Sequence, residues 1–305
     1  MLIMSGPAAR DWVTCVRGAT LEQCWLGFGT ASLHSAVSTQ EAVALLETAL
    51  DHGVTHFDTA RAYGWGKTEA LLGVVAARRR DEMFIVSKAG IAPPSLLGRA
   101  MRKLGLRLPG AREPQFGQFA PAQVQRSVEQ SLRALKTDRL DAMLLHEIEA
   151  ASVTDELKRA VEDLKTSGKA LRIGIATDNA ASAAIAAEHP ELCDIVQVAA
   201  PPIGVRAKAL GRVPVRHSVL GPRLRQFAAD LNADKARAEL FADETGLDPQ
   251  DVSALARLLL AEASRGALVL FSSTRADHII DNASLLRSAN DAVAVEGLER
   301  FLAAA

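Results

Sequence analysis

Eight short apolar runs, separated by longer amphipathic segments, are the feature that most constrains the fold of this chain. Most runs are β-branched or aliphatic almost throughout, which is typical of parallel strands buried on both faces. They lie at 26–33, 54–58, 83–88, 140–146, 170–176, 194–199, 213–219 and 267–273. Helical spacing of apolar residues marks four of the segments between them: 39–53, 121–137, 153–168 and 248–266. Thr39, Thr154 and Asp248 lie near three of the expected N-caps.

Strands that alternate with helices in this way predict a (β/α)8 TIM barrel, with residues 1–305 as a single domain. A doubly wound sheet is the competing layout, and it usually has a GxGxxG turn after its first strand. Here the corresponding GFGTAS has Ser32 in place of the last glycine, which favours the barrel.

Two connections depart from a regular barrel. A long Pro/Gly/Arg-rich loop at 89–120 is expected after the third strand, and it carries a basic cluster of Arg99, Arg102, Lys103, Arg107 and Arg112. Loops of this length inside compact domains are usually functional lids or disordered. The cluster is consistent either with binding an anion or with a solvated loop face. Residues 201–212, in contrast, are too few for a crossover helix of ordinary length.

Composition narrows the possible functions. A formal net charge of -1 predicts no electrostatic attraction to nucleic acid or to an anionic membrane. No apolar run approaches the roughly 20 residues that cross a bilayer, and the first residues lack the basic region of a secretory signal. The 3 cysteines have no paired spacing, which favours reduced thiols and a cytoplasmic protein. His52 and His56 have metal-like spacing, but Gly53 lies between them and no zincin-type Glu accompanies them, so no metal is expected.

Polar residues follow three of the apolar runs at the point where each predicted strand ends. Asp58 ends the second run, Lys88 the third and His146 the fourth, while Tyr63, the only tyrosine, follows Asp58 closely. Each alone has an ordinary structural interpretation, such as a helix cap or a packing residue. In a barrel, however, the carboxyl ends of the strands meet at one rim, and we expect these four side chains to converge there. Glu147 is expected to point away, because neighbours in a strand face opposite sides.

The four groups suit proton transfer to an oxygen that becomes an alcohol. A tyrosine titrates near pH 10, so a nearby ammonium is expected to lower its pKa and make it a usable proton donor. Asp58 would hold Lys88 charged, and His146 would donate a hydrogen bond to a carbonyl oxygen.

The segment FDTARAYGWGKTEALLG (57–73) resembles the DTAxxYGxxExxLG signature of aldo-keto reductases. It matches at Asp58, Thr59, Ala60, Tyr63, Gly64, Glu69, Leu72 and Gly73. IVSKAG, LDAMLLHEIE, LRIGIAT, DIVQV and HIIDN resemble further family segments in the same order, over nearly the whole chain. The resemblance implies a (β/α)8 barrel that reduces aldehydes and ketones with NAD(P)H, without metal or flavin. It makes Tyr63 the general acid, Lys88 and Asp58 the pair that tunes its pKa, and His146 the residue that orients the carbonyl.

The same resemblance implies a set of cofactor contacts. They are Gly29, Thr30, Asp58, Thr177, Gln197, His217, Ser218, Leu220, Ser272, Ser273, Arg275, His278, Asp281 and Asn282. The chain departs from the family pattern at three places: Ala176-Thr177 replaces the usual Ser-Asn, His217 replaces an aromatic tyrosine, and Ser272 replaces a frequent lysine. Arg275 suits a 2′-phosphate, so NADP(H) is favoured over NAD(H).

Three functions therefore stay open at the level of sequence. The first is reduction of a small aldehyde or ketone, or the reverse oxidation of a sugar or alcohol, with Tyr63 as general acid/base. The second is a cofactor-binding redox sensor or regulatory subunit with little turnover. The third is a barrel lyase or isomerase that uses Lys88 as a Schiff base. The sequence indicates neither the substrate nor the oligomeric state.

Overall fold

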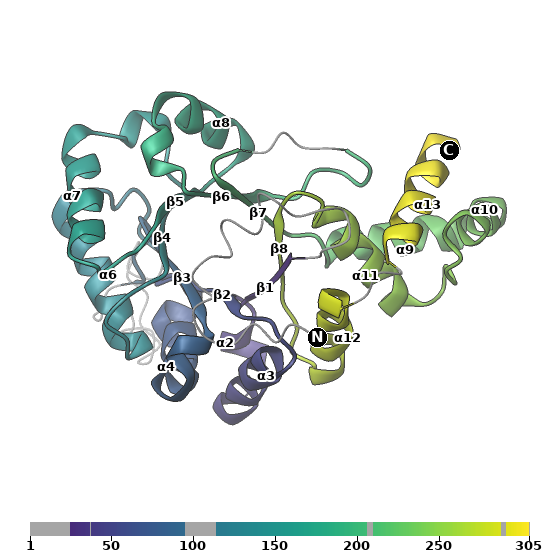
Figure 1. The fold of residues 1–305 in the computed structure, drawn as a ribbon, viewed down its shortest axis with the longest axis horizontal. Coiled ribbons are helices and arrows are strands. Elements are labelled where there is room, and N and C mark those ends of the chain that lie inside the picture. Colours follow the sequence, from purple (N-terminus) through teal and green to yellow (C-terminus); the bar gives the residue numbers. More distant parts are fainter. Residues whose placement is uncertain (1–24, 37, 95–113, 206–209, 288–290, 305) are drawn as a thin grey trace, which may run out of the picture.

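A closed barrel of eight parallel strands forms the centre of the protein (Figure 1). The computed structural model describes residues 25–36, 38–94, 114–205, 210–287 and 291–304. The strands are β1 (Trp25–Gly29), β2 (His56–Asp58), β3 (Phe84–Ala89), β4 (Ala142–His146), β5 (Ile173–Ala176), β6 (Ile195–Ala199), β7 (Val213–His217) and β8 (Leu268–Phe271). Each pairs with its sequence neighbours, and β8 closes on β1. The predicted (β/α)8 fold is confirmed.

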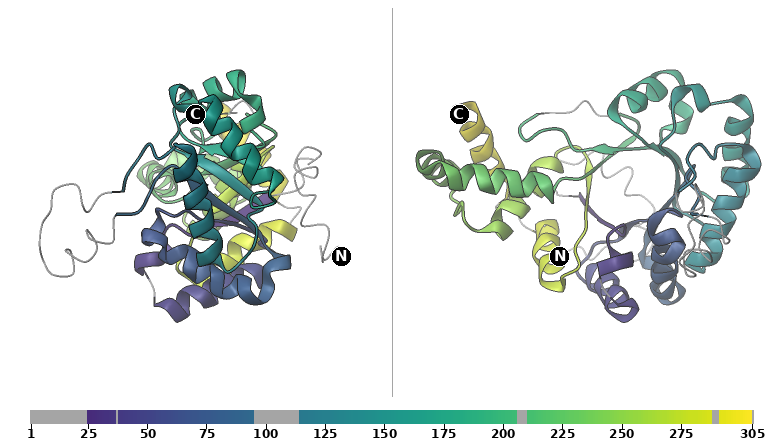
Figure 2. Two further views of the ribbon diagram at one scale, coloured as in Figure 1. Left: turned by 90° about the vertical axis from the view of Figure 1, so that its left-hand side faces the viewer. Right: turned by 180° about the vertical axis from the view of Figure 1, so that it is seen from behind.

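Helices surround this barrel, and Figure 2 shows α9, α10 and α13 extending to one side of it. The α-helices are α2 (Leu33–Ala36), α3 (Thr39–Asp51), α4 (Lys67–Arg79), α6 (Pro121–Leu135), α7 (Asp155–Thr166), α8 (Asn179–Glu188), α9 (Pro222–Ala233), α10 (Lys235–Thr245), α11 (Val252–Ala263), α12 (Ala276–Ala283) and α13 (Asp291–Ala304). Short 3-10 helices lie at η2 (Tyr63–Gly66), η3 (Arg80–Glu82), η4 (Ala150–Ser152), η5 (Pro190–Leu192) and η6 (Ser284–Arg287). Phe241 holds the extension together by edge-to-face contacts with Phe227 and Phe301.

Several predicted boundaries were wrong by a few residues. The first run was expected to stay extended to Leu33, but β1 ends at Gly29 and α2 begins at Leu33, because the Leu33 amide turns back to the Thr30 carbonyl. Thr154 caps α7 as predicted. The other two caps lie at Ser38, in a capping box with Glu41, and at Asp251, whose carboxylate accepts the Ala254 amide.

The two irregular connections lie after β6 and after β3. Between β6 and β7, the described residues form no helix, in agreement with the short predicted link. After β3, an antiparallel bridge joins Ala92 to Gln115 at the base of the long loop. Residues 95–113 lie outside the described residues, and the predicted basic cluster lies there with them.

Alternation along the strands divides the core into two parts. One set of side chains fills the barrel interior: Phe84, Val86, Ala142, Leu144, Ala176, Ile195, Val213, Val215, Leu268 and Leu270. The larger set, which includes Ile85, Met143 and Val196, packs outside the barrel against the helices. Strand residues that alternate in phase with Phe84 and Val86 therefore point into the barrel interior.

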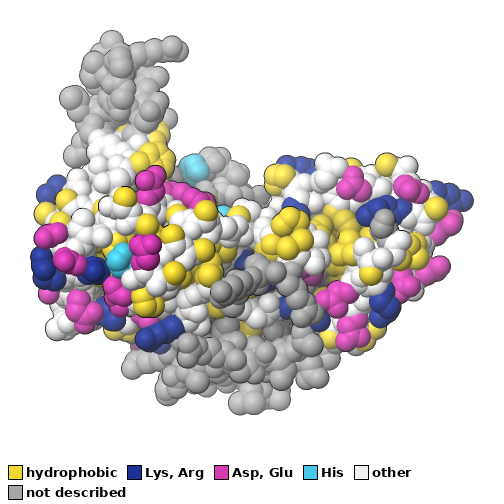
Figure 3. Space-filling view, turned by 90° about the horizontal axis from the view of Figure 1, so that it is seen from above, with side chains coloured by type: hydrophobic (Ala, Val, Ile, Leu, Met, Phe, Trp, Pro, Cys, Tyr) yellow, Lys and Arg dark blue, Asp and Glu magenta, His cyan; other side chains and the backbone are white. Residues whose placement is uncertain are grey.

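The outer surface carries mixed charge. Figure 3 shows Lys/Arg and Asp/Glu side chains interspersed over one face, and many form exposed ion pairs such as Arg79–Asp51. Among the described residues, every helix is too short or too polar to cross a membrane.

Candidate active site

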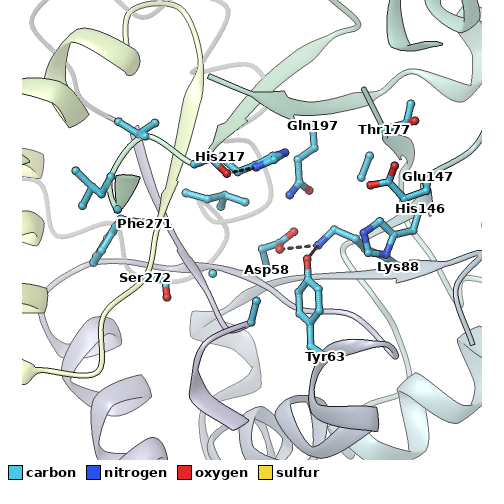
Figure 4. A pocket seen from close by; sticks show the side chains of 18 residues that line it. Asp58, Tyr63, Lys88, His146, Glu147, Thr177, Gln197, His217, Phe271 and Ser272 are labelled. Carbon is cyan, nitrogen blue, oxygen red and sulfur yellow. Dashed lines mark hydrogen bonds and ion pairs between the residues drawn. The ribbon is translucent and has the colours of Figure 1, made fainter. Parts of the chain in front are cut away.

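The strand alternation that fills the barrel also positions the candidate catalytic residues. Asp58 lies two residues after the buried His56 on β2, Lys88 two after Val86 on β3, and His146 two after Leu144 on β4. Each is the next inward position toward the carboxyl end of its strand. Figure 4 shows all three directed into one pocket with Tyr63. The structure thus brings together the four side chains that the sequence predicted to converge.

Lys88 connects two of these groups. Its buried ammonium donates to Asp58 Oδ1 at 2.5 Å, to the Thr59 carbonyl at 3.1 Å and to the Tyr63 hydroxyl oxygen at 3.2 Å. Burial acts to lower the pKa of Lys88, but the charges of Asp58 and Tyr63 and the hydrogen bonds to them outweigh this, so its pKa is raised. Lys88 is therefore a fixed cation directly beside the phenol.

In the protein without cofactor, the pKa of Tyr63 is shifted in the direction opposite to the one expected from the sequence. Burial of the phenol raises its pKa, and although the Lys88 charge lowers it, the net direction is upward. The prediction of a lowered Tyr63 pKa is therefore wrong for the free protein. It included the charge of Lys88 but not the burial of the phenol, which has the larger effect.

His146 lies edge-on to Tyr63, with ring centroids 6.1 Å apart. Burial, with smaller contributions from the charges of Lys88 and His217, lowers its pKa to about 3. The imidazole is neutral at physiological pH and keeps one N–H to donate to an acceptor in the pocket.

An unusual turn places Tyr63. Gly64, Trp65 and Gly66 all have positive φ, of 53°, 58° and 85°. A Cβ at Gly64 would lie 2.3 Å from the His34 Cβ, so glycine is required there by both conformation and space. Thr68 anchors the turn by donating its hydroxyl to the Tyr63 carbonyl at 3.2 Å.

Glu69 and Gly73, also part of the signature, hold this turn against the barrel. The Glu69 carboxylate is fully buried and accepts from Arg61 and from the Ser87 hydroxyl, each at 2.7 Å. It therefore joins the loop before α4 to β3, the strand that carries Lys88. A Cβ at Gly73 would lie 2.3 Å from the Ala134 carbonyl oxygen, so glycine permits the close approach of α4 to α6. Sequence patterns identified these two residues only as matches to the signature.

The pocket above these groups has a volume of about 400 Å³. It is lined by Gly29, Ala31, Asp58, Tyr63, Lys88, His146, Glu147, Ala176, Thr177, Gln197, His217, Ser218, Val219, Leu220, Gly221, Leu270, Phe271 and Ser272. Sequence reasoning did not single out Ala31, Val219, Gly221, Leu270 or Phe271. They are apolar or small residues at strand ends, with no signal apart from their position.

Glu147 was expected to point away from the pocket, and this was wrong. Its carboxylate lines the pocket and, in Figure 4, points inward beside His146. β4 ends at His146, and Glu147 has φ 55°, in the left-handed region. The strand alternation therefore no longer applies at Glu147.

Not every predicted cofactor residue lines the pocket. Thr30 is fully buried and donates its hydroxyl to the Asp58 carbonyl at 3.1 Å. Ser273 and Arg275 lie between β8 and α12, and His278, Asp281 and Asn282 lie on α12 itself. The exposed Arg275 side chain forms an ion pair with Asp277.

One observation, independent of the resemblance in sequence, indicates that the pocket residues fit a nicotinamide cofactor. Gln197, in the middle of β6, is only 5% exposed, and its Oε1 has no hydrogen-bond partner among the described residues. Such an orphaned acceptor costs free energy unless a donor meets it, and the carboxamide N–H2 of a nicotinamide supplies one.

Comparison with known proteins identifies the family. The model of the aldo/keto reductase family matches residues 25–201, more than half of the chain. The chain belongs to the aldo/keto reductase family.

Two named relatives match part of the chain. D-threo-aldose 1-dehydrogenase from a Pseudomonas species is 32% identical over 168 residues, covering 49% of each protein. 6-Dehydroglucose reductase from Agrobacterium fabrum is 33% identical over 135 residues, 43% of this chain and 42% of that one. The matched segment thus spans less than half of each of these relatives.

Solved structures match over more of the chain. An aldo-keto reductase from Klebsiella pneumoniae in complex with NADPH superposes with a TM-score of 0.62 at 25% identity, covering 86% of this chain and 85% of the other. These comparisons confirm the predicted family, and they support its predicted class, an NAD(P)H-dependent oxidoreductase.

Proposed function

We propose that this aldo/keto reductase transfers hydride between NADP(H) and a small carbonyl compound, reducing an aldehyde or ketone or oxidising a sugar or alcohol in reverse, with Tyr63 as general acid/base. The observation that carries the proposal is the position of the buried Lys88 ammonium, which donates to both Asp58 and the Tyr63 hydroxyl at the base of the pocket.

The cofactor, when bound, supplies the hydride that adds to the carbonyl carbon. The chain's own residues hold and move the proton. Tyr63 gives its hydroxyl proton to the carbonyl oxygen as negative charge develops there, and Lys88 stabilises the resulting phenolate. His146 is neutral and donates a hydrogen bond to the same oxygen, while Asp58 keeps Lys88 charged and in place.

We propose NADP(H) rather than NAD(H) on the basis of the segment after β8. Arg275 and His278 are exposed there and offer cationic and hydrogen-bonding groups to a 2′-phosphate. Arg275 would have to leave Asp277, but exposed ion pairs contribute little to stability, so a phosphate can displace this one. Fluorescence titration with NADPH and NADH tests this, and Arg275→Ala should weaken NADPH binding without changing NADH binding. Equal affinities in the wild type would remove the preference.

Turnover is tested by steady-state oxidation of NADPH with a panel of aldehydes. Tyr63→Phe should lower kcat by at least about 100-fold while the dissociation constant for NADPH stays nearly unchanged. Tight cofactor binding without turnover on the whole panel would favour the alternative of a redox sensor. Borohydride trapping of a substrate on Lys88 would support a Schiff-base enzyme instead. The cytoplasmic location stays a prediction.

A further inference from the structure

Glu147 is a charged group in the pocket that the proton-transfer mechanism does not use. It follows His146 directly, and its amide donates to the Ala176 carbonyl at 2.8 Å, which fixes the backbone at the end of β4. With φ 55°, a glutamate adopts a backbone conformation that costs free energy for most L residues. That conformation directs the carboxylate into the mouth of the pocket, where it is solvent-exposed (Figure 4).

The charge balance of the lining makes Glu147 the group that a substrate would meet. Asp58 and Lys88 neutralise each other in a buried ion pair. Burial holds the pKa of His146 and of His217 below the ordinary value, so both rings are neutral. No arginine lies among the described lining residues. Among the described lining residues, Glu147 therefore carries the one uncompensated charge, beside several neutral donors and acceptors.

We propose that Glu147 selects neutral, polyhydroxylated carbonyl substrates. Its carboxylate accepts hydrogen bonds from hydroxyl groups next to the reacting carbonyl, and it repels carbonyl compounds that carry a carboxylate or phosphate. Hydrogen bonds to a charged acceptor are stronger than those between neutral groups, so removal of the charge affects hydroxylated substrates selectively. This inference rests on the proposed carbonyl reduction and deepens it by naming the substrate class.

Substrate discrimination by the wild type, Glu147→Gln and Glu149→Gln tests the proposal. Glu149 is also exposed and lies two residues further on, outside the pocket lining, so it is a matched control for charge. Steady-state kcat/KM is measured with glyceraldehyde, with propanal, which lacks the hydroxyls, and with glyoxylate, which is an anion. We expect the glyceraldehyde-to-propanal ratio to fall about tenfold or more in Glu147→Gln, with a relative gain for glyoxylate. Glu149→Gln should keep the wild-type ratios.

A second measurement does not require turnover. The charge of Glu147 acts to raise the Tyr63 pKa, so Glu147→Gln should move the phenolate titration of the cofactor-free protein to lower pH. Unchanged substrate ratios in an active Glu147→Gln, or the same loss in Glu149→Gln, would overturn the inference while the proposed reduction stands. If the wild type reduces none of the three compounds, the proposed function fails, and the inference that rests on it fails with it. An unmoved titration midpoint in Glu147→Gln would overturn the position of the carboxylate near Tyr63 from which the inference is argued.

Discussion

The Lys88–Tyr63 contact makes a measurable prediction about ionisation. In Lys88→Met, the phenolate of Tyr63 loses a cation that lies 3.2 Å from its oxygen. Coulomb's law at this distance gives a stabilisation of between about 1 kcal/mol at the dielectric constant of water and about 5 kcal/mol at an effective value of 20. The site is buried, so the upper part of this range applies. We therefore expect the titration midpoint of Tyr63 to rise clearly in Lys88→Met.

The titration of Tyr63 can be measured without interference from other tyrosines, because Tyr63 is the only tyrosine of the chain. Phenolate absorbance, followed as pH is raised, therefore reports a single group. Lys67→Met is a matched control, since Lys67 is an exposed cation at the start of α4, and its removal should leave the midpoint near that of the wild type.

The double variant Asp58→Asn/Lys88→Met separates the charge effect from damage to the fold. Asp58 raises the pKa of Tyr63, and it does so less strongly than Lys88 lowers it. The midpoints should therefore increase in the order wild type, double variant, Lys88→Met. A midpoint in Lys88→Met at or below the wild-type value, in a folded protein, would refute the assignment of Lys88 as the group that tunes Tyr63.

The remaining predictions concern the support of the site and its response to acid. Glu69→Ala leaves the Arg61 guanidinium without its buried partner and should lower the free energy of unfolding by about 3–5 kcal/mol in denaturant titrations; a loss within about 0.5 kcal/mol would show that the carboxylate is dispensable. Gly73→Ala forces a methyl group against the Ala134 carbonyl and should cost about 1–3 kcal/mol by the same measurement, and a neutral result would contradict the close approach of the helices. The His146 pKa of about 3 lies below that of an unfolded histidine, about 6.5, so the unfolded state takes up the proton first as pH falls. Stability should therefore decline from about pH 6.5 to about pH 3, and thermal melts of His146→Asn should show a shallower decline; parallel curves would refute the low pKa.

Much of the catalytic geometry could be predicted because strand alternation is a local rule. Asp58, Lys88 and His146 each follow an apolar strand at an inward position, so the period of two was enough to place them at one rim. Glu147 was mispredicted by the same rule, since the strand ends one residue earlier and a positive φ redirects the side chain. No residue type in LLHEIE signals that change, because glutamate is not a residue that favours the left-handed region.

Tertiary packing explains the other differences. The environment of Tyr63 depends on how the YGWG turn packs over the barrel, and on Glu69 reaching across to Ser87, a contact between residues 18 apart in the chain. Sequence reasoning could identify Lys88 as a neighbouring charge, but it could not weigh that charge against burial. The helix caps were similarly shifted, as at Ser38, because several adjacent polar residues can act as a cap and the choice depends on the path of the preceding chain.

The raised pKa of Tyr63 favours one direction of the proposed reaction. A phenol that stays protonated at neutral pH is ready to donate its proton, as reduction of a carbonyl requires, whereas oxidation of an alcohol requires the phenolate as base. Reduction should therefore be independent of pH around neutrality, while kcat for the oxidation should rise as pH increases toward the pKa of Tyr63. Lys88 limits the cost of the phenolate once the proton has moved, so its removal should slow both directions and shift the rising limb of oxidation to higher pH. An oxidation rate that falls with increasing pH would mean that another group, and not Tyr63, accepts the proton.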